Sequence, residues 1–259
     1  MRTVHVTRYV TPLREGGSLP AIVEADDDGM YVLKFRGAGQ GPRALIAELV
    51  SGEIARALGL SVPELVFAEL DPDLARTEPD PEIFALIRDS AGLNLALDYL
   101  PSSVMFDPVV EKVASDLASR IVWFDAFVTN VDRTARNTNM LMWHRQLHLI
   151  DHGAALYFHH DWDDSYLERS RDPFARIRDH VLLPFAGALQ EAHESMIERL
   201  TPQLIRSLVA LIPDELLADD RAFATPGEFR SAYERYLLRR LEPPHDFFQE
   251  AQRAHAQLV

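Results

Sequence analysis

Apolar and polar residues alternate over short segments in the first third of the chain, and this period of two is typical of half-buried β-strands. Clusters of Gly, Ser and Asp separate the first three segments and indicate turns. The pattern predicts strands at residues 3–10, 21–24, 30–35, 65–70 and 93–100. Residues 44–58 are instead rich in helix formers and stop before Gly59, so a helix is expected there. An acidic, proline-rich loop at 71–81 and a short helix at 82–87 are also expected.

Longer helical patterns replace the strands from Pro108 onward. A helix is expected over residues 109–128, followed by a hairpin of two short strands at 139–143 and 146–150. Beyond about residue 174 the chain is expected to be helical, with prolines where helices start or break.

This change of pattern predicts an α+β protein with two lobes. We expect a small, mostly antiparallel sheet with one helix in residues 1–100 and a helical lobe in residues 101–259. Residues 101–108 are expected to connect the two lobes.

The composition is that of a globular protein able to bury a substantial core, with 259 residues of which 47% are hydrophobic. The absence of cysteine excludes disulfides and thiolate metal sites. The sequence shows no secretory signal pattern and no apolar run of about 20 residues, the length that spans a bilayer. We therefore expect a soluble, cytoplasmic protein.

The formal net charge is −14, and the acidic residues are spread along the chain. Such a surface repels phosphate backbones and anionic lipids, so neither nucleic acid nor membrane is an expected partner. A phosphate-bearing ligand would need a local source of positive charge, either a metal ion or a few placed cations.

A polar stretch, NVDRTARN at residues 130–137, precedes the expected hairpin, and Asp151 follows the hairpin's second strand. Because both ends of a hairpin lie together, Asp132, Asn137 and Asp151 are expected to converge, with Gly153 allowing a sharp turn. Carboxylate and amide oxygens suit a hard cation such as Mg²⁺, which often completes its shell with water and substrate phosphates. The alternative is that these Asp and Asn side chains only cap turns, since this spacing also arises by chance.

Lys34 lies inside an apolar strand segment, YVLKF. A lysine at such a position can direct its ammonium group at phosphate oxygens, as strand lysines do in phosphotransferases. The alternative is an outward-facing lysine on an edge strand.

Taken in order along the chain, these features resemble the HipA-like kinases, whose fold is similar to that of protein and phosphatidylinositol kinases. The resemblance rests on the strand Lys34, an acid on the next helix, N-x-D-x-x-x-x-N at 130–137 and I-D-H-G at 150–153, and it spans about residues 10–165. It implies a bilobal kinase fold and transfer of the γ-phosphoryl group of ATP, with Mg²⁺, to a hydroxyl, expected to be Ser or Thr of a protein.

The resemblance also implies the role of each residue. Asp132 would accept the hydroxyl proton, Asn137 and Asp151 would hold Mg²⁺, and Lys34 would bind phosphate oxygens. The motifs also serve small-molecule kinases similar to aminoglycoside or lipid kinases, and the acidic surface argues against a lipid headgroup. A nucleotide-binding pseudokinase or interaction module is a third reading.

The partner of Lys34 should be an acid on helix 44–58. The family pattern points to Glu48, whereas a helical wheel places Glu53 in the middle of the apolar face and Glu48 opposite. We select Glu48 on the family pattern. If the helix is packed on both sides, either acid could reach Lys34.

Two further regions complete the expected nucleotide site. Gly16, Gly17 and Ser18 can approach phosphates closely, although a plain hairpin turn is the alternative. The resemblance also makes Ser18 a candidate for autophosphorylation. A kinase-like hinge is expected to present backbone groups of Asp98, Tyr99 and Leu100 to adenine. HipA toxins carry an additional N-terminal subdomain used with their antitoxin, and this chain starts almost directly at the expected sheet, so we do not expect an antitoxin partner.

The remaining polar residues near the loop have simpler expected roles. Arg133 steadies the loop or a phosphate, or is an exposed solubilising residue, and Asn139 is a turn residue. His159 and His160 are expected to pack near the loop rather than to bind metal, because the histidines show no ligand spacing.

Overall fold

The computed structural model describes residues 1–13, 19–39, 41–163, 165–218 and 220–258. The strands are β1 (Thr3–Pro12), β2 (Ala21–Ala25), β3 (Met30–Lys34), β4 (Leu65–Leu70), β5 (Gly92–Asp98), β6 (Val104–Met105), β7 (Met140–Trp143) and β8 (Gln146–Leu149). The α-helices are α1 (Pro42–Ala57), α2 (Pro81–Asp89), α3 (Ser115–Val128), α4 (Leu189–Arg199), α5 (Pro202–Val209), α6 (Pro226–Arg240) and α7 (Asp246–Ala256). Short 3-10 helices are η1 (Pro72–Thr77), η2 (Tyr157–His160), η3 (Glu168–Arg171), η4 (Ala175–Asp179), η5 (Leu183–Phe185) and η6 (Asp214–Leu216).

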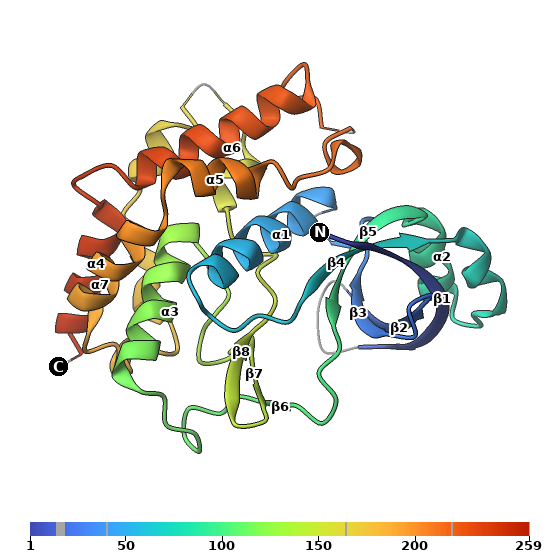
Figure 1. Ribbon diagram of the computed structural model, residues 1–259, viewed down its shortest axis with the longest axis horizontal. Helices are drawn as coiled ribbons and strands as arrows, with labels where there is room; N and C mark the ends of the chain where they lie inside the picture. Colours follow the sequence, from blue (N-terminus) through green and yellow to red (C-terminus); the bar gives the residue numbers. More distant parts are fainter. Residues whose placement is uncertain (14–18, 40, 164, 219, 259) are drawn as a thin grey trace.

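Strands β1 to β5 form a closed barrel in the order β1-β2-β3-β5-β4, which forms one end of the molecule in Figure 1. Most neighbours are antiparallel, as expected from the sequence. The barrel is closed by parallel pairing of β1 with β4, in the register Thr3↔Phe67. Its strands enclose a hydrophobic core of their own, to which α2 contributes Ile83 and Ile87. The predicted 71–81 loop differs from the structure, because Asp71 caps a 3-10 helix, η1, through its side chain.

Helix α1 lies between the barrel and the helical part of the molecule (Figure 1). Most of its residues are buried, on every side of the helix. Its apolar side chains, such as Leu49 and Ile54, belong to the larger hydrophobic core, which also contains Leu95 and Leu97 of β5 and most of α3. A helix covered all round has no solvent-facing stripe, which explains why a helical wheel does not identify its functional side.

Helix α3 is the centre of the helical part and packs against α4 and α7. It begins at Ser115, so the predicted start at residue 109 is wrong. Val109 and Val110 are 91% and 73% exposed, and two β-branched residues without a packing partner gain little from a helical conformation. The expected helical C-terminal region is confirmed, with Pro202 and Pro226 at the first positions of α5 and α6.

The predicted hairpin is also confirmed, as β7 and β8. Residues 101–108, the expected connection, contain β6, which pairs with β7 and so extends the hairpin to a three-stranded sheet. The hairpin and α3 together position the polar loop at residues 130–137.

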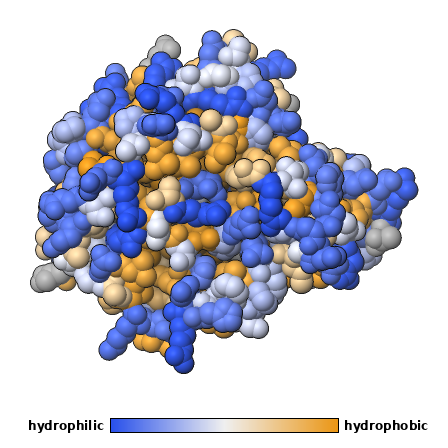
Figure 2. Space-filling model, in the orientation of Figure 1, coloured by the Kyte–Doolittle hydropathy of each residue, from blue (hydrophilic) through white to orange (hydrophobic). Residues whose placement is uncertain are grey.

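Hydrophilic residues dominate the barrel end of the face shown in Figure 2, while apolar residues gather over its middle. Within the described part of the chain, no helix combines the length and the apolar character needed to cross a membrane.

Candidate active site

Three elements meet at Lys34, the last residue of β3. Its Nζ lies 2.7 Å from Oε2 of Glu48 on α1 and 2.5 Å from Oδ1 of Asp151, two residues beyond the end of β8. The Glu48 side chain is fully buried, whereas the side chains of Lys34 and Asp151 are 13% and 45% exposed. The ammonium group therefore points inward toward a partly open site, and the edge-strand alternative for Lys34 does not hold.

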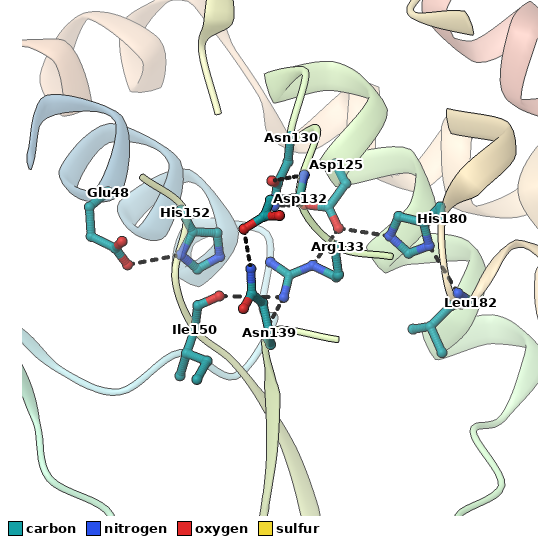
Figure 3. Close-up of polar contacts among 10 residues, drawn as sticks. All are labelled: Glu48, Asp125, Asn130, Asp132, Arg133, Asn139, Ile150, His152, His180 and Leu182. Carbon is teal, nitrogen blue, oxygen red and sulfur yellow. Dashed lines mark hydrogen bonds and ion pairs between the residues drawn. The ribbon is translucent and has the colours of Figure 1, made fainter. Parts of the chain in front are cut away.

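The charges of this cluster stabilise one another. Burial alone would raise the pKa of the Glu48 carboxyl, but Lys34 and His152 outweigh it and hold that pKa well below its ordinary value. Burial alone would lower the pKa of Lys34, but the carboxylates of Glu48 and Asp151 raise it above its ordinary value. The second Glu48 oxygen lies 3.3 Å from Nδ1 of His152 (Figure 3). Lys34 and Glu48 are thus both charged at neutral pH.

Glu53, the acid favoured by the helical wheel, does not contact Lys34. It pairs with Arg56 one turn along α1, at 2.9 Å. The structure therefore supports the choice of Glu48 as the lysine's partner.

Replacing Glu48 with glutamine is expected to lower both stability and any activity that depends on Lys34. The change leaves Lys34 with only the half-exposed Asp151 as its counter-charge, so the cost should stay below the value of about 3–5 kcal/mol for breaking a fully buried pair. Glu53→Gln is the control on the same helix, because its partner Arg56 is 39% exposed and such i,i+3 pairs stabilise a helix by only about 0.2–0.5 kcal/mol. Urea unfolding of both variants measures the difference. Equal unfolding free energies would contradict the assigned pairing.

The Asp132 carboxylate is held by two amide side chains. Its Oδ2 accepts hydrogen bonds from Nδ2 of Asn137 at 2.8 Å and from Nδ2 of Asn139 at 3.2 Å. Burial raises the pKa of Asp132 against these two hydrogen bonds, and the nearby Asp151 adds to the rise. The result is a fixed carboxylate with increased proton affinity. Asn139 is thus more than the turn residue that the sequence predicts.

A buried polar network holds the loop in place (Figure 3). Asp125, in the last turns of α3, accepts hydrogen bonds from Nδ2 of Asn130 at 2.9 Å, Nε of Arg133 at 2.6 Å and Nε2 of His180 at 2.8 Å. His180 is oriented by Leu182, whose backbone N–H donates to its Nδ1 at 3.0 Å. Burial alone would raise the pKa of Asp125, but Arg133 and His180 outweigh it and hold that pKa well below its ordinary value.

Arg133 connects this network to the hairpin. It is 1% exposed and donates to the backbone oxygens of Asn139, before β7, and Ile150, after β8. Of the expected roles for Arg133, the structure supports steadying the loop and excludes an exposed, solubilising residue. Arg133 therefore connects the loop that carries Asp132 to the chain segment that carries Asp151.

The sequence predicts that Gly153 makes the sharp turn after β8. In the structure, Asp151 itself makes it. Asp151 has φ 57°, in the left-handed region, and Gly153 does not have positive φ. Asn139 is also left-handed, with φ 47°. Such conformations are tolerated by Asp and Asn better than by most residues, and they cluster at functional sites when the surrounding structure enforces them.

Asn137 and Asp151 present oxygen atoms that fit a hard divalent cation. Because the Asp132 carboxylate only accepts hydrogen bonds, Asn137 turns its Nδ2 to it, and no described residue bonds the Asn137 Oδ1. Asp151 uses Oδ1 for Lys34. The described residues contain no group of three or more His, Asp or Glu side chains that could hold a metal by themselves. A cation here would need further oxygens from phosphates or water, as Mg²⁺ commonly does.

The other predicted site residues are placed as follows. Gly16, Gly17 and Ser18 lie outside the described residues. The backbone N–H groups of Asp98 and Tyr99 donate to Glu64 and Met30 at 2.8 and 3.0 Å, so these two donors are already paired within the barrel region. Leu100 is buried.

Of the two adjacent histidines, His160 lines a cavity together with Val131 of the loop, as expected, and His159 packs against α6. His159 is buried, and its Nδ1 lies 2.9 Å from the hydroxyl of Tyr233 on α6. Burial lowers the pKa of His159 well below its ordinary value, so this imidazole is neutral at physiological pH.

Sequence reasoning missed Asp125, His152 and His180 as supports of the site. Asp125 had a signal, since a charged residue within an apolar helical run requires a buried partner. His180 had none, because it lies 55 residues from Asp125 and meets it only in the fold.

A model of the family described as HipA-like kinase matches residues 6–251 of the chain. Among solved structures, the chain is similar to the Helicobacter pylori proinflammatory kinase CtkA, at 14% sequence identity and a TM-score of 0.57 over 99% of both chains. It is also similar to the Golgi casein kinase with Mn/ADP bound, at 14% identity and a TM-score of 0.50, over 98% of this chain and 73% of that one. At such identities the two structures show a shared kinase-like fold. No curated protein matches the chain.

Proposed function

Because the chain belongs to the HipA-like kinase family, we propose that it transfers the γ-phosphoryl group of ATP, with a divalent cation such as Mg²⁺, to a serine or threonine hydroxyl of a protein. The observation that carries this proposal is Lys34, bonded at once to Glu48 and Asp151. These contacts join the barrel, α1 and the end of the hairpin around the ammonium group of Lys34. In this proposal, the ammonium group is where phosphate oxygens of the nucleotide bind.

In this proposal Asp132 accepts the proton of the acceptor hydroxyl. Its raised pKa brings its proton affinity closer to that required of a general base near neutral pH, and the amides of Asn137 and Asn139 fix the oxygen that they bond. Lys34, oriented by Glu48, binds phosphate oxygens. Asn137 and Asp151 hold the cation, which when bound neutralises charge on the transferring phosphoryl group.

Phosphoryl transfer depends on alignment and charge neutralisation more than on covalent chemistry. The rigid frame around Asp125 and Arg133 supplies the alignment. The Golgi casein kinase, with its Mn and ADP, supports a divalent metal and a nucleotide for this fold.

The proposal includes the division of the chain into a nucleotide-binding lobe, residues 1–100, and a lobe that carries the catalytic loop, residues 101–259. The closed barrel with its own core supports this division. Gly16, Gly17 and Ser18 are proposed to approach the phosphates, and the segment Asp98, Tyr99 and Leu100 to lie against adenine.

Isothermal titration with ATP, with and without Mg²⁺, tests the nucleotide site. We expect tighter binding with Mg²⁺ in the wild type, and loss of most of this gain in Asp151→Asn, because the cation loses a carboxylate. Asp89→Asn, at the exposed last residue of α2, is the matched control and should bind as the wild type does. A folded protein that binds no nucleotide would remove the assigned roles of Lys34, Asn137 and Asp151.

A further inference from the structure

A cavity of about 610 Å³ lies against the catalytic loop, residues 130–137. Thr129, at the end of α3, and Val131, directly before Asp132, form the wall on the loop side. The remaining walls come from residues within 157–161 and 169–176 and from Tyr236 on α6. The nucleotide-site residues Lys34, Asn137 and Asp151 do not line it.

Aromatic and aliphatic side chains make up half of the residues that line this cavity. Phe158 stacks on Tyr236, with ring centroids 3.4 Å apart and planes at 10°. Phe174 is also in the wall, and Tyr157 is 60% exposed. These rings give the concave site an apolar side that is open to solvent at Tyr157.

The charges around the cavity nearly cancel. Arg169 and Arg176 line it together with Asp161 and Asp172. Asp163, which does not line it, pairs with Arg169 through two contacts of 3.0 Å, so the acids exceed the arginines by only one. A polycationic sugar would require a larger acidic surplus here, and a phosphorylated ligand a basic one. The cavity can therefore select its ligand mainly through apolar contacts.

Residues next to the cavity wall are hydrogen-bonded to the catalytic loop. His180, directly after η4, forms a β-bridge with Thr134 and a hydrogen bond with Asp125. The backbone N–H of Val181 donates to the carbonyl oxygen of Arg133 at 3.2 Å. The position of the cavity relative to Asp132 is thus set by the same network that holds the loop.

Resting on the proposed kinase activity, we infer that this cavity binds a large apolar, preferably aromatic, side chain of a polypeptide acceptor, within two residues of the phosphorylated hydroxyl. Consecutive Cα atoms are about 3.8 Å apart, so a short stretch of peptide joins a hydroxyl at Asp132 to a side chain beside Val131. The acceptor class is therefore polypeptide, and the cavity distinguishes it from small polar alcohols.

A degenerate peptide library with one fixed serine tests this inference. In the wild type, phenylalanine should exceed alanine in kcat/KM by about 10- to 100-fold at one position near the serine, the factor expected for burying a large apolar side chain. In Tyr157→Ala, which removes an exposed wall, and in Ala175→Trp, which fills the space, this ratio should fall toward one. Phe84→Ala, an exposed aromatic on α2, should keep the wild-type ratio. Each ratio is internal to its variant, so a general change in activity does not move it.

Peptide transfer without an apolar preference would overturn the inference, as would a preference that both cavity variants retain. Transfer confined to small alcohols would also overturn it, while leaving the kinase proposal intact. ATP titration on the same preparation identifies the remaining outcome, because a folded protein that neither binds ATP nor transfers phosphate overturns the proposed function and this inference together.

Discussion

Replacing Asp132 with asparagine is expected to lower phosphate transfer by about 10²–10⁴-fold, because an amide cannot accept the hydroxyl proton. The measurement is transfer of radiolabelled phosphate from ATP to the protein itself or to casein. Asp116→Asn, at an exposed position in the first turn of α3, is the matched control and should keep the wild-type rate. A full rate in the Asp132 variant would exclude this residue as the base.

The same substitution should not reduce stability at neutral pH. Burial raises the pKa of Asp132 in the folded protein, so ionisation of this carboxyl opposes folding increasingly as the pH rises above the unfolded pKa of about 3.9, and fully above the folded pKa. The melting temperature of Asp132→Asn relative to the wild type should therefore be more favourable at pH 7 than at pH 4. Loss of transfer in a variant that is at least as stable as the wild type would separate catalysis from folding.

The largest expected effect on stability belongs to Asp125. Asparagine at this position leaves the fully buried Arg133 without its charge partner, and such a loss typically costs about 3–5 kcal/mol. Guanidinium unfolding of Asp125→Asn measures the cost, with Asp116→Asn again as the control. A double-mutant cycle with Arg133→Met isolates the pair, and a coupling free energy near zero would contradict the network described here.

The pH dependence of this effect has a defined sign. The pKa of Asp125 lies well below its ordinary value in the folded protein, so its contribution is present above the unfolded pKa of about 3.9. It is lost as the pH falls through the folded value. The difference in stability between wild type and Asp125→Asn should therefore be constant near neutral pH and shrink in strong acid.

Local patterns predicted the local structure well. The strand positions, the hairpin and the helical C-terminal region followed from alternation, helix-forming stretches and proline positions. Closure of the barrel did not, because the parallel pairing of β1 with β4 joins segments about 60 residues apart, and neither strand's sequence specifies its partner. Val109 and Val110 look helical in sequence but lack a surface to pack on.

The candidate site was predictable where a motif carries its own chemistry, as in Asp132, Asn137 and Asp151. The choice between Glu48 and Glu53 was not accessible to a helical wheel, because that method assumes one buried face and α1 is buried all round. The family resemblance supplied the choice that amphipathicity could not. His180 could not be predicted at all, since its role depends on a contact made only in the folded chain.

Under the proposed function, the position of Lys34 between two carboxylates bears on the order in which nucleotide and metal arrive. A divalent cation arriving alone would compete with an ammonium group already bonded to Asp151. Phosphate oxygens that engage Lys34 would instead release this carboxylate for the metal. Nucleotide and metal should therefore favour each other's binding, and thermodynamic reciprocity requires the factor to be the same in both directions. The resting site would then respond weakly to free metal and strongly to the metal–nucleotide complex.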